Sequence, residues 1–156
     1  PQLDAKRVII KGVSYGSFIS LALGVREQKR VKAIIAESPI ISIKNYLAYS
    51  PKSIQSLQIP EYGTLSNENL MDQSEKLSAL QSDNLQNWSL PLFLSIGEND
   101  VRVPIQDVIN LKEKLKAKGI PVWFIKAPKE GHFWGNYDNK IFLNVAEIVF
   151  IQKFME

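Results

Sequence analysis

The sequence predicts an α/β fold in which helices cover both faces of a parallel β-sheet. Short, nearly continuous apolar runs have the composition of strands that are buried on both faces. Helical stretches separate these runs, and such alternation is typical of a parallel sheet. A chain of 156 residues fits one domain. The predicted strands are residues 7–12, 31–36, 92–97 and 122–127.

The first half of the chain holds two of these strands and an irregular region. Residues 7–12 (RVIIKG) form the first strand, and the apolar stretch 17–28 follows as a helix. Residues 31–36 (VKAIIA) are the second strand. Residues 39–90 are rich in Ser, Asn and Gln and contain three prolines, so we expect loops and short helices there, one of them near 67–80.

The third strand and its helix carry clear boundary signals. Residues 92–97 (LFLSIG) are apolar and β-prone. The helix is expected over 104–119, because Pro104 suits a first helical position and Gly119 suits a helix end.

The last strand and helix complete the predicted fold. Residues 122–127 (VWFIKA) are aromatic and β-branched, and residues 139–154 read as a long helix. Asp138 or Asn139 is the expected cap of that helix. Adjacent parallel strands in chain order would leave residues 7–12 at one edge of the sheet, although their composition is that of a central strand. We therefore expect this edge to pair with a second copy or with a segment outside the chain.

Composition narrows the classes of function. The net charge is +3, and its excess lies mainly in residues 111–118, on the solvated face of a helix. No basic patch is interleaved with aromatic residues, so nucleic-acid binding is not expected. With no cysteine and one histidine, disulfides and thiolate chemistry are excluded, and neither a metal site nor a cofactor is expected.

Two further features bear on the location of the protein and on whether the chain is part of a longer one. No apolar run approaches the ~20 residues of a membrane span, and no signal segment is visible. The absence of cysteine allows a cytoplasmic location without establishing it, so localisation stays open. The chain begins without methionine and enters a strand almost at once, which leads us to expect that it is part of a longer protein.

The segment Gly12-Val13-Ser14-Tyr15-Gly16 matches the pattern G-x-S-x-G. In this pattern a serine sits on a strained turn between a strand and a helix, and its hydroxyl projects beyond the sheet. Strand and helix approach closely, so glycines are expected at Gly12 and Gly16. The sequence supplies the required context, since a strand precedes the motif and a helix follows it. A glycine-rich turn with a surface serine is the alternative.

A serine needs a base, and a base needs an orienting group. His132 is the only histidine, and it lies in a Gly-bounded loop after the last strand. Asp100 directly follows the third strand. Taken singly, the histidine is more simply structural and the aspartate more simply a turn residue. Together, Ser14, Asp100 and His132 each follow the carboxyl end of a predicted strand, where active sites of α/β sheets collect.

The chain resembles the catalytic domain of the prolyl oligopeptidase family of serine peptidases. The chain order Ser, Asp, His is that of α/β-hydrolases. The segment KRVIIKGVSYGSF is similar to the family's strand and serine turn, and the signatures G-x-x-D-x-R-V-P and E-G-H stand at 97–104 and 130–132. The resemblance implies that residues 1–156 are the C-terminal portion of an α/β-hydrolase peptidase domain, a partial fold with about four parallel strands.

The resemblance and the chemistry together imply a role for each group. Ser14 would attack a carbonyl, His132 would transfer its proton to the leaving amine, and Asp100 would orient the imidazole. The backbone N–H of Tyr15 would donate to the oxyanion. In the family a tyrosine upstream of the serine turn supplies a second donor, which no residue before Ser14 provides. The isolated chain is therefore expected to be impaired.

The resemblance also suggests roles for several other residues, and each of them has a simpler structural alternative. Tyr46 and Tyr49 fall where the family places aromatic residues of the substrate pocket, although core packing accounts for at least one of them. Arg102 either anchors the loop of Asp100 or is a free surface residue. Glu37, at the end of the second strand, is either functional or solvated. Ser17 replaces a glycine usual in the family, and we expect the turn to survive with tighter packing.

The function implied is hydrolysis of oligopeptides by a serine peptidase through an acyl-enzyme intermediate. An esterase or lipase-like enzyme of the same fold is the first alternative. A non-catalytic interaction module that retains the fold is the second. The sequence leaves open the residue preferred at the scissile bond and the choice between endo-, dipeptidyl- and aminopeptidase.

Overall fold

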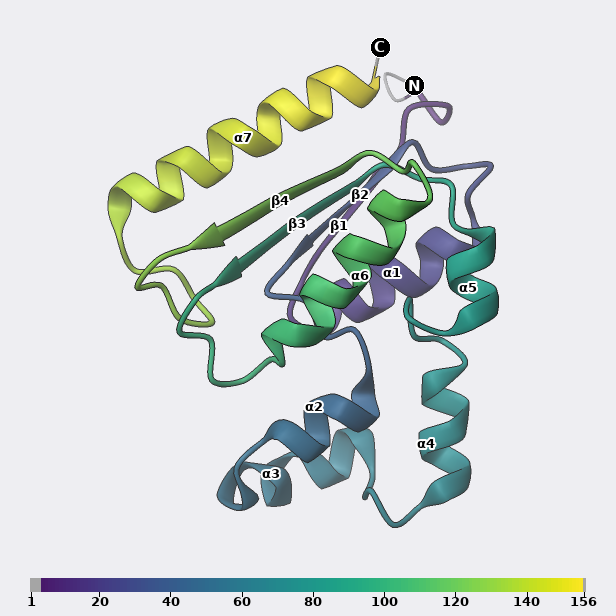
Figure 1. Ribbon diagram of the computed structural model, residues 1–156, viewed down its shortest axis with the longest axis vertical. Helices are drawn as coiled ribbons and strands as arrows, with labels where there is room; N and C mark the ends of the chain where they lie inside the picture. The colour runs from purple at the N-terminus through teal and green to yellow at the C-terminus, as the bar shows by residue number, and fades with distance from the viewer. Residues whose placement is uncertain (1–3, 156) are drawn as a thin grey trace.

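A four-stranded parallel sheet forms the centre of the molecule (Figure 1). A computed structural model describes residues 4–155. The strands lie side by side in chain order, so each strand pairs with the next one along the sequence. They are β1 (Ile9–Val13), β2 (Ala33–Glu37), β3 (Leu92–Gly97) and β4 (Val122–Ala127). The predicted α/β class is confirmed.

Helices cover both faces of this sheet. α1 (Tyr15–Arg26) and α6 (Ile105–Ala117) lie on one face, and α7 (Tyr137–Met155) lies alone on the other (Figure 1). The region between β2 and β3 folds into short helices, as predicted. These are α2 (Ile43–Tyr49), α3 (Lys52–Tyr62), α4 (Glu68–Glu75) and α5 (Ser82–Asn87). None of the helices within residues 4–155 is both long and apolar enough to cross a bilayer.

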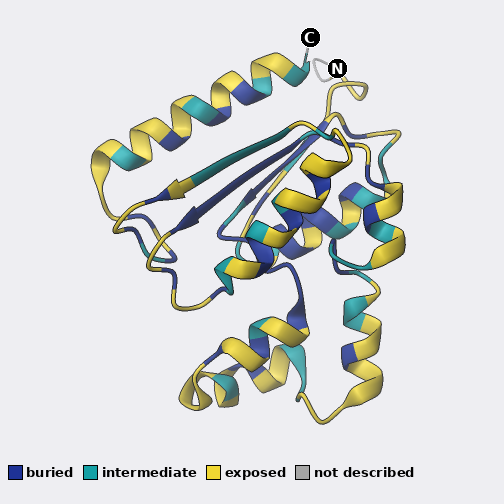
Figure 2. Cartoon of the chain, in the orientation of Figure 1, coloured by how far each residue is buried: buried dark blue, intermediate teal, exposed yellow. Residues whose placement is uncertain are grey.

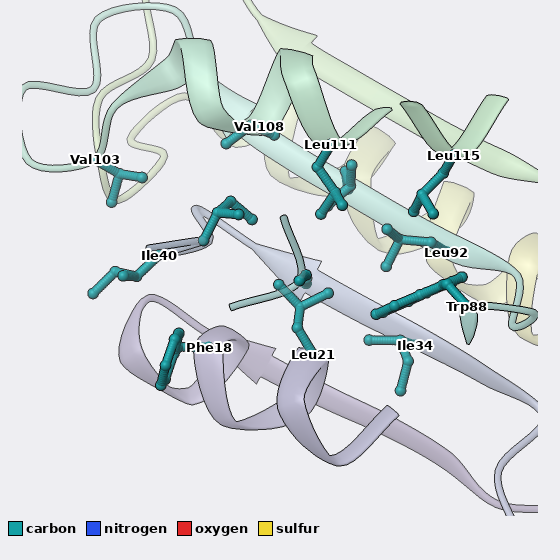
Figure 3. Packing of buried hydrophobic residues seen from close by; sticks show 14 of the residues in the cluster. Phe18, Leu21, Ile34, Ile40, Trp88, Leu92, Val103, Val108, Leu111 and Leu115 are labelled. Carbon is teal, nitrogen blue, oxygen red and sulfur yellow. The ribbon is translucent and has the colours of Figure 1, made fainter. Parts of the chain in front are cut away.

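Each face of the sheet has its own hydrophobic core, because the apolar runs of β2 and β3 send side chains alternately to both sides. The larger core joins Leu21 of α1, Ile34 of β2 and Leu111 of α6 (Figure 3). The smaller core, under α7, centres on Phe93 and Phe150. All residues of β3 are buried (Figure 2). The sheet is therefore held rigidly between two layers.

Element boundaries differ slightly from the sequence-based expectations. β3 and β4 match their predicted ranges, whereas β1 and β2 begin two residues later than predicted. The predicted cap of the last helix is wrong. The Asn139 N–H donates to Asn136 Oδ1 at 3.1 Å, so Asn136 caps α7, and the helix includes Asp138 and Asn139.

The strand β1 lies at an edge of the described sheet. It pairs with β2 alone, with Ile9 opposite Ala33. Ile9 and Ile10 are only half-buried, and Val8 just before the strand is exposed. An apolar strand with one free edge is unusual, because such edges recruit further strands.

Phe150 is the residue on which the smaller core most depends. It is fully buried, and its ring meets Phe93 at 5.4 Å and Trp123 at 5.6 Å between centroids. We expect Phe150→Ala to lower the free energy of unfolding by about 3–5 kcal/mol, because it leaves a cavity between α7 and the sheet. Urea titration measures this loss. Leu57→Ala, at an exposed position, is the control, and an equal loss in both variants would contradict the packing described.

Candidate active site

Ser14 occupies a strained turn between β1 and α1. Its φ is 55°, in the left-handed region that residues other than glycine rarely adopt. The Ser14 N–H donates to the carbonyl of Glu37 at 2.9 Å, which ties the turn to the end of β2. Strain of this kind costs on the order of 1–3 kcal/mol and persists only where the surroundings enforce it. The structure therefore has the serine turn that the sequence motif predicts.

The two glycines of the motif differ in their surroundings. A Cβ at Gly12 would lie 2.1 Å from the carbonyl oxygen of Gly16, so only glycine fits there. A Cβ at Gly16 would meet nothing within 4 Å. The expected crowding is thus present at Gly12, but the side-chain position of Gly16 is open. It is the backbone of Gly16, and not the position of its missing side chain, that lies close to Gly12. The sequence pattern alone does not tell these two cases apart.

Ser17 joins three segments around this turn. Its side chain is completely buried. Its hydroxyl lies 2.6 Å from the Gly12 carbonyl and 2.9 Å from the Glu37 carbonyl, and it shares its single hydrogen between them. Serine at this position therefore adds hydrogen bonds between α1 and the ends of β1 and β2. Tighter packing was expected here, but the polar contacts could not be read from the sequence.

The structure brings Ser14, His132 and Asp100 together. His132 Nε2 lies 2.9 Å from Ser14 Oγ, and His132 Nδ1 lies 2.9 Å from Asp100 Oδ2. The side chains of His132 and Asp100 are 6% and 0% exposed. Residues far apart in the sequence thus form one continuous hydrogen-bonded chain from the carboxylate to the hydroxyl.

The loop after β3 fixes the orientation of the carboxylate. Asp100 Oδ1 accepts hydrogen bonds from the N–H groups of Arg102 and Val103, at 2.8 and 3.1 Å. The other carboxylate oxygen, Oδ2, is therefore available to accept a hydrogen bond from His132 Nδ1. A carboxylate only accepts, so the hydrogen of the neutral imidazole lies on Nδ1. The lone pair of Nε2 then faces the hydroxyl of Ser14, which is the arrangement of a general base.

The loop that carries His132 is held against the end of β3. A Cβ at Gly97 would lie 2.2 Å from the carbonyl oxygen of Gly131, so glycine is required for this approach. On the other side, Ser38 Oγ donates to the His132 carbonyl at 2.9 Å. Ser38 has a φ of 41° and is buried. The histidine is therefore positioned by its backbone as well as by its ring.

Glu130 organises the same loop from within. Its carboxylate accepts hydrogen bonds from Asn139 Nδ2 at 2.7 Å and from the N–H groups of Gly135 and Asn136 at 2.6 and 3.1 Å. The bond from Asn139, together with those two, holds the pKa of Glu130 below its usual value. Glu130 thus links the loop to the first turn of α7.

An aromatic cluster lies beside the serine turn. The ring of Tyr62 packs edge-on against Tyr15 at 5.3 Å and against Tyr46 at 5.7 Å between centroids. Burial raises the pKa of Tyr62. The structure therefore places the predicted Tyr46 near the turn, whereas Tyr49 is exposed and outside this cluster. Tyr62 was not predicted as a site residue. It lies in the irregular region 39–90, and nothing in the sequence of that region indicates which of its residues fold back to the serine turn.

The side chain of Arg102 lies against the histidine loop, and it forms no ion pair with a carboxylate of residues 4–155. Its guanidinium lies 5.5 Å above the ring of Phe133, and that ring packs edge-on against His132 at 4.9 Å. A hollow of about 340 Å³ opens beside Arg102 and Tyr46. A second hollow of about 370 Å³ is lined by Val13, Ser38 and His132. His132 thus borders the second of these two recesses and not the first.

Three charged residues lie below the serine turn. Lys11 Nζ is 2.5 Å from a carboxylate oxygen of Glu37 and 2.6 Å from one of Glu147. One ammonium cannot neutralise two carboxylates. Burial, reinforced by Glu37, raises the pKa of Glu147 to about 7. Desolvation alone would lower the pKa of Lys11, but the two carboxylates raise it. Glu37 is thus paired and not solvated.

The arrangement defines an α/β-hydrolase-fold protein, with a serine turn after one strand, an acid after another and a histidine loop after the last. The chain belongs to the prolyl oligopeptidase family, whose sequence model matches residues 1–156. The predicted family resemblance is therefore confirmed.

Individual relatives agree with this assignment. The acylamino-acid-releasing enzyme of Rattus norvegicus is 29% identical over 138 residues, which cover 83% of this chain and 18% of the relative. The Pyrococcus horikoshii acylaminoacyl peptidase aligns with a TM-score of 0.69 at 27% identity, over 85% of this chain and 21% of that one. A puromycin-hydrolyzing peptidase of Mycobacterium tuberculosis shares the fold, with a TM-score of 0.84 at 20% identity, over 97% of this chain and 23% of that one. The chain spans about a fifth of these proteins.

Gly97 provides a test of how the histidine loop is seated. We expect Gly97→Ala to lower the free energy of unfolding by more than about 2 kcal/mol, because the new methyl group overlaps backbone atoms. Gly135→Ala is the matched control in the same region, since a Cβ there meets nothing within 4 Å. Denaturant titration compares the two variants. Equal stability would contradict the close approach described.

Glu147 provides a test of the charged cluster. Its pKa rises from the ordinary value of 4.5 to about 7 in the native chain. Between these values the native state holds a proton that the unfolded state has released, so stability must fall as the pH rises from about 4.5 to 7. We expect Glu147→Gln to remove this fall. Urea titrations across that pH range measure it, with the exposed Glu113→Gln as control; an unchanged slope in Glu147→Gln would contradict the assignment.

Proposed function

We propose that this chain supplies the catalytic groups of a serine peptidase that acts on oligopeptides through an acyl-enzyme. The observation that carries the proposal is the hydrogen-bonded chain from Asp100 through His132 to Ser14, at 2.9 Å for both contacts of the imidazole. Membership of the prolyl oligopeptidase family supports the same reaction class.

Each step uses groups already in position. Ser14 Oγ attacks the scissile carbonyl carbon while its proton passes to His132 Nε2. The C–N bond then breaks, and the proton on Nε2 passes to the leaving amine. Water, deprotonated by the same nitrogen, hydrolyses the acyl-serine and regenerates the hydroxyl. Asp100 stabilises the imidazolium formed in both halves of the reaction.

The backbone of Tyr15 stabilises the oxyanion in this proposal. Tyr15 is the first residue of α1, so its N–H has no acceptor within the helix. The positive end of the helix dipole adds to the field at this point. Loss of one oxyanion donor typically costs about 10²–10³ in rate, so a chain with one donor alone would be slow.

Substrate binding is assigned to the aromatic cluster. Tyr15, Tyr46 and Tyr62 form an apolar wall beside Ser14, suited to the residue before the scissile bond. Tyr49 is the weaker candidate because it points outside this wall. The curated relatives are named for the release of acylamino acids, so N-acylated peptides are the first substrates to test.

We also propose that the free edge of β1 pairs with a strand from outside the chain. The support is its apolar, half-buried composition at an edge. A covered edge would also hold the serine turn from its open side. Hydrogen exchange at the amides of β1 tests this pairing in the protein at its natural length, since protection equal to that of β3 is expected.

Substitution of Ser14 and of Asp100 tests the mechanism. In the protein at its natural length, Ser14→Ala should abolish both fluorophosphonate labelling and hydrolysis of N-acylpeptide amides. Asp100→Asn should lower kcat by about 10⁴-fold, because the amide favours the wrong imidazole tautomer. The exposed Asp83→Asn is the control and should behave as the unsubstituted protein. Kinetics on a peptide-amide library measure all three.

Two results would contradict the proposal. Turnover of short acyl esters without any peptide amide would indicate an esterase of the same fold. Absence of labelling at Ser14 in the natural-length protein would indicate a non-catalytic module that retains the turn as a relic of the fold.

A further inference from the structure

Two consecutive residues bind the serine turn and the histidine loop. They are Glu37, the last residue of β2, and Ser38, and we call them the 37–38 link. The Glu37 carbonyl accepts a hydrogen bond from the Ser14 N–H at 2.9 Å. The Ser38 hydroxyl donates to the His132 carbonyl at 2.9 Å. Ser14 and His132 lie 118 positions apart in the sequence, yet neighbouring residues of a third segment hold both of them.

The backbone of Ser38 has a conformation that serine rarely adopts. Its φ is 41°, in the left-handed region, and the residue is buried. Its N–H donates to the Ser95 carbonyl of β3 at 2.7 Å. Glycine would take this φ without strain, but it would have no hydroxyl to donate to His132. Strained residues of this kind cluster at functional sites, so the strain indicates that the hydroxyl has a role in the site.

The side chain of Glu37 fixes the 37–38 link to its surroundings. Its carboxylate lies 2.5 Å from Lys11 Nζ, and that ammonium lies 2.6 Å from a carboxylate oxygen of Glu147. The link is therefore tied to β1 and α7 through Glu37, and to β3 through the N–H of Ser38. A segment that three elements hold is a fixed reference for the groups that bind to it.

The contact from Ser38 acts on a part of His132 that Asp100 does not bind. Asp100 binds Nδ1 of the ring and so orients the imidazole. Within residues 4–155, the bond from Ser38 is the only hydrogen bond to the backbone of His132. The position of that backbone helps to determine how far Nε2 lies from Ser14 Oγ, a distance of 2.9 Å. Proton transfer depends strongly on this distance, since a displacement of about 1 Å can cost about 10²-fold in rate.

We propose that Ser38 is a positioning residue, whose hydroxyl sets the distance between His132 Nε2 and the hydroxyl of Ser14. This inference rests on the proposed function, because it assigns the Ser38 hydroxyl to the proton transfer between those two groups. Ser38 acts through the backbone of His132, so its loss should lower kcat and leave KM unchanged. The expected fall in kcat is about 10- to 100-fold.

Glycine and asparagine variants of the protein at its natural length test the proposal. Ser38→Gly removes the hydroxyl and accepts a positive φ, so kcat for N-acylpeptide amides should fall while the urea midpoint stays unchanged. Ser38→Asn also tolerates this φ and carries an amide donor. Ser38 borders the hollow of about 370 Å³, which leaves room for the larger side chain. We expect the asparagine variant to recover most of kcat.

Ser78→Ala is the matched control. Ser78 is also buried, and its hydroxyl also donates to a backbone carbonyl, that of Ile41, at 2.8 Å. This change should lower the urea midpoint and leave kcat unchanged. The proposal is overturned if Ser38→Gly behaves in the same way, because Ser38 would then have a structural role alone. Equal losses of kcat in the glycine and asparagine variants would also overturn it.

¹⁵N NMR of the His132 ring tests the same contact without turnover. With Ser38 present, Ser14→Ala should shift the Nε2 resonance, because the Ser14 hydroxyl is bonded to that nitrogen. In the Ser38→Gly background the same change should have a much smaller effect, and equal effects in both backgrounds would contradict the proposal. A natural-length protein without any hydrolysis would contradict the proposed function instead, and the ring spectra would then decide the role of Ser38.

Discussion

The close approach of β1 and α1 at Gly12 is the constraint on which the rest of the site depends. Because Gly12 has no side chain, the carbonyl of Gly16 comes within the space that a Cβ would fill. The backbone can then turn sharply from β1 into α1 at Ser14, which has a φ of 55°. Its hydroxyl is thereby presented at the carboxyl edge of the sheet, where the loops after β3 and β4 also end. The rigidity of a sheet buried on both faces keeps these groups in register.

The second constraint is the joint fixing of acid and histidine. Gly97 lets the histidine loop rest on the end of β3, and two backbone N–H groups hold one oxygen of Asp100, so the other faces the ring. Glu130 then links that loop to the start of α7. Helix α7 in turn reaches back to the serine turn through Glu147 and Lys11. The site is thus built on elements from both faces of the sheet.

Most of the strands and helices of this structure could be predicted from the sequence. β3 and β4 were predicted because their runs are continuous and bounded by turn residues, and Ser14, Asp100 and His132 were found because each follows a strand end. What it did not reveal are contacts between distant segments. Tyr62 returns to the serine turn from an irregular region, and Lys11 and Glu147 lie 136 positions apart. The cap of α7 at Asn136 was missed because several polar residues there suit a cap equally well, and only the backbone decides among them.

The central claim is that His132 accepts the proton of Ser14 because Asp100 holds its other nitrogen. His132 is the only histidine, so ¹⁵N NMR of the ring reports on this group without ambiguity. The account predicts that the neutral imidazole carries its hydrogen on Nδ1, and that this tautomer is lost when Asp100 is replaced by alanine. A ring protonated on Nε2, or one that exchanges freely between both forms in the unsubstituted protein, would contradict it.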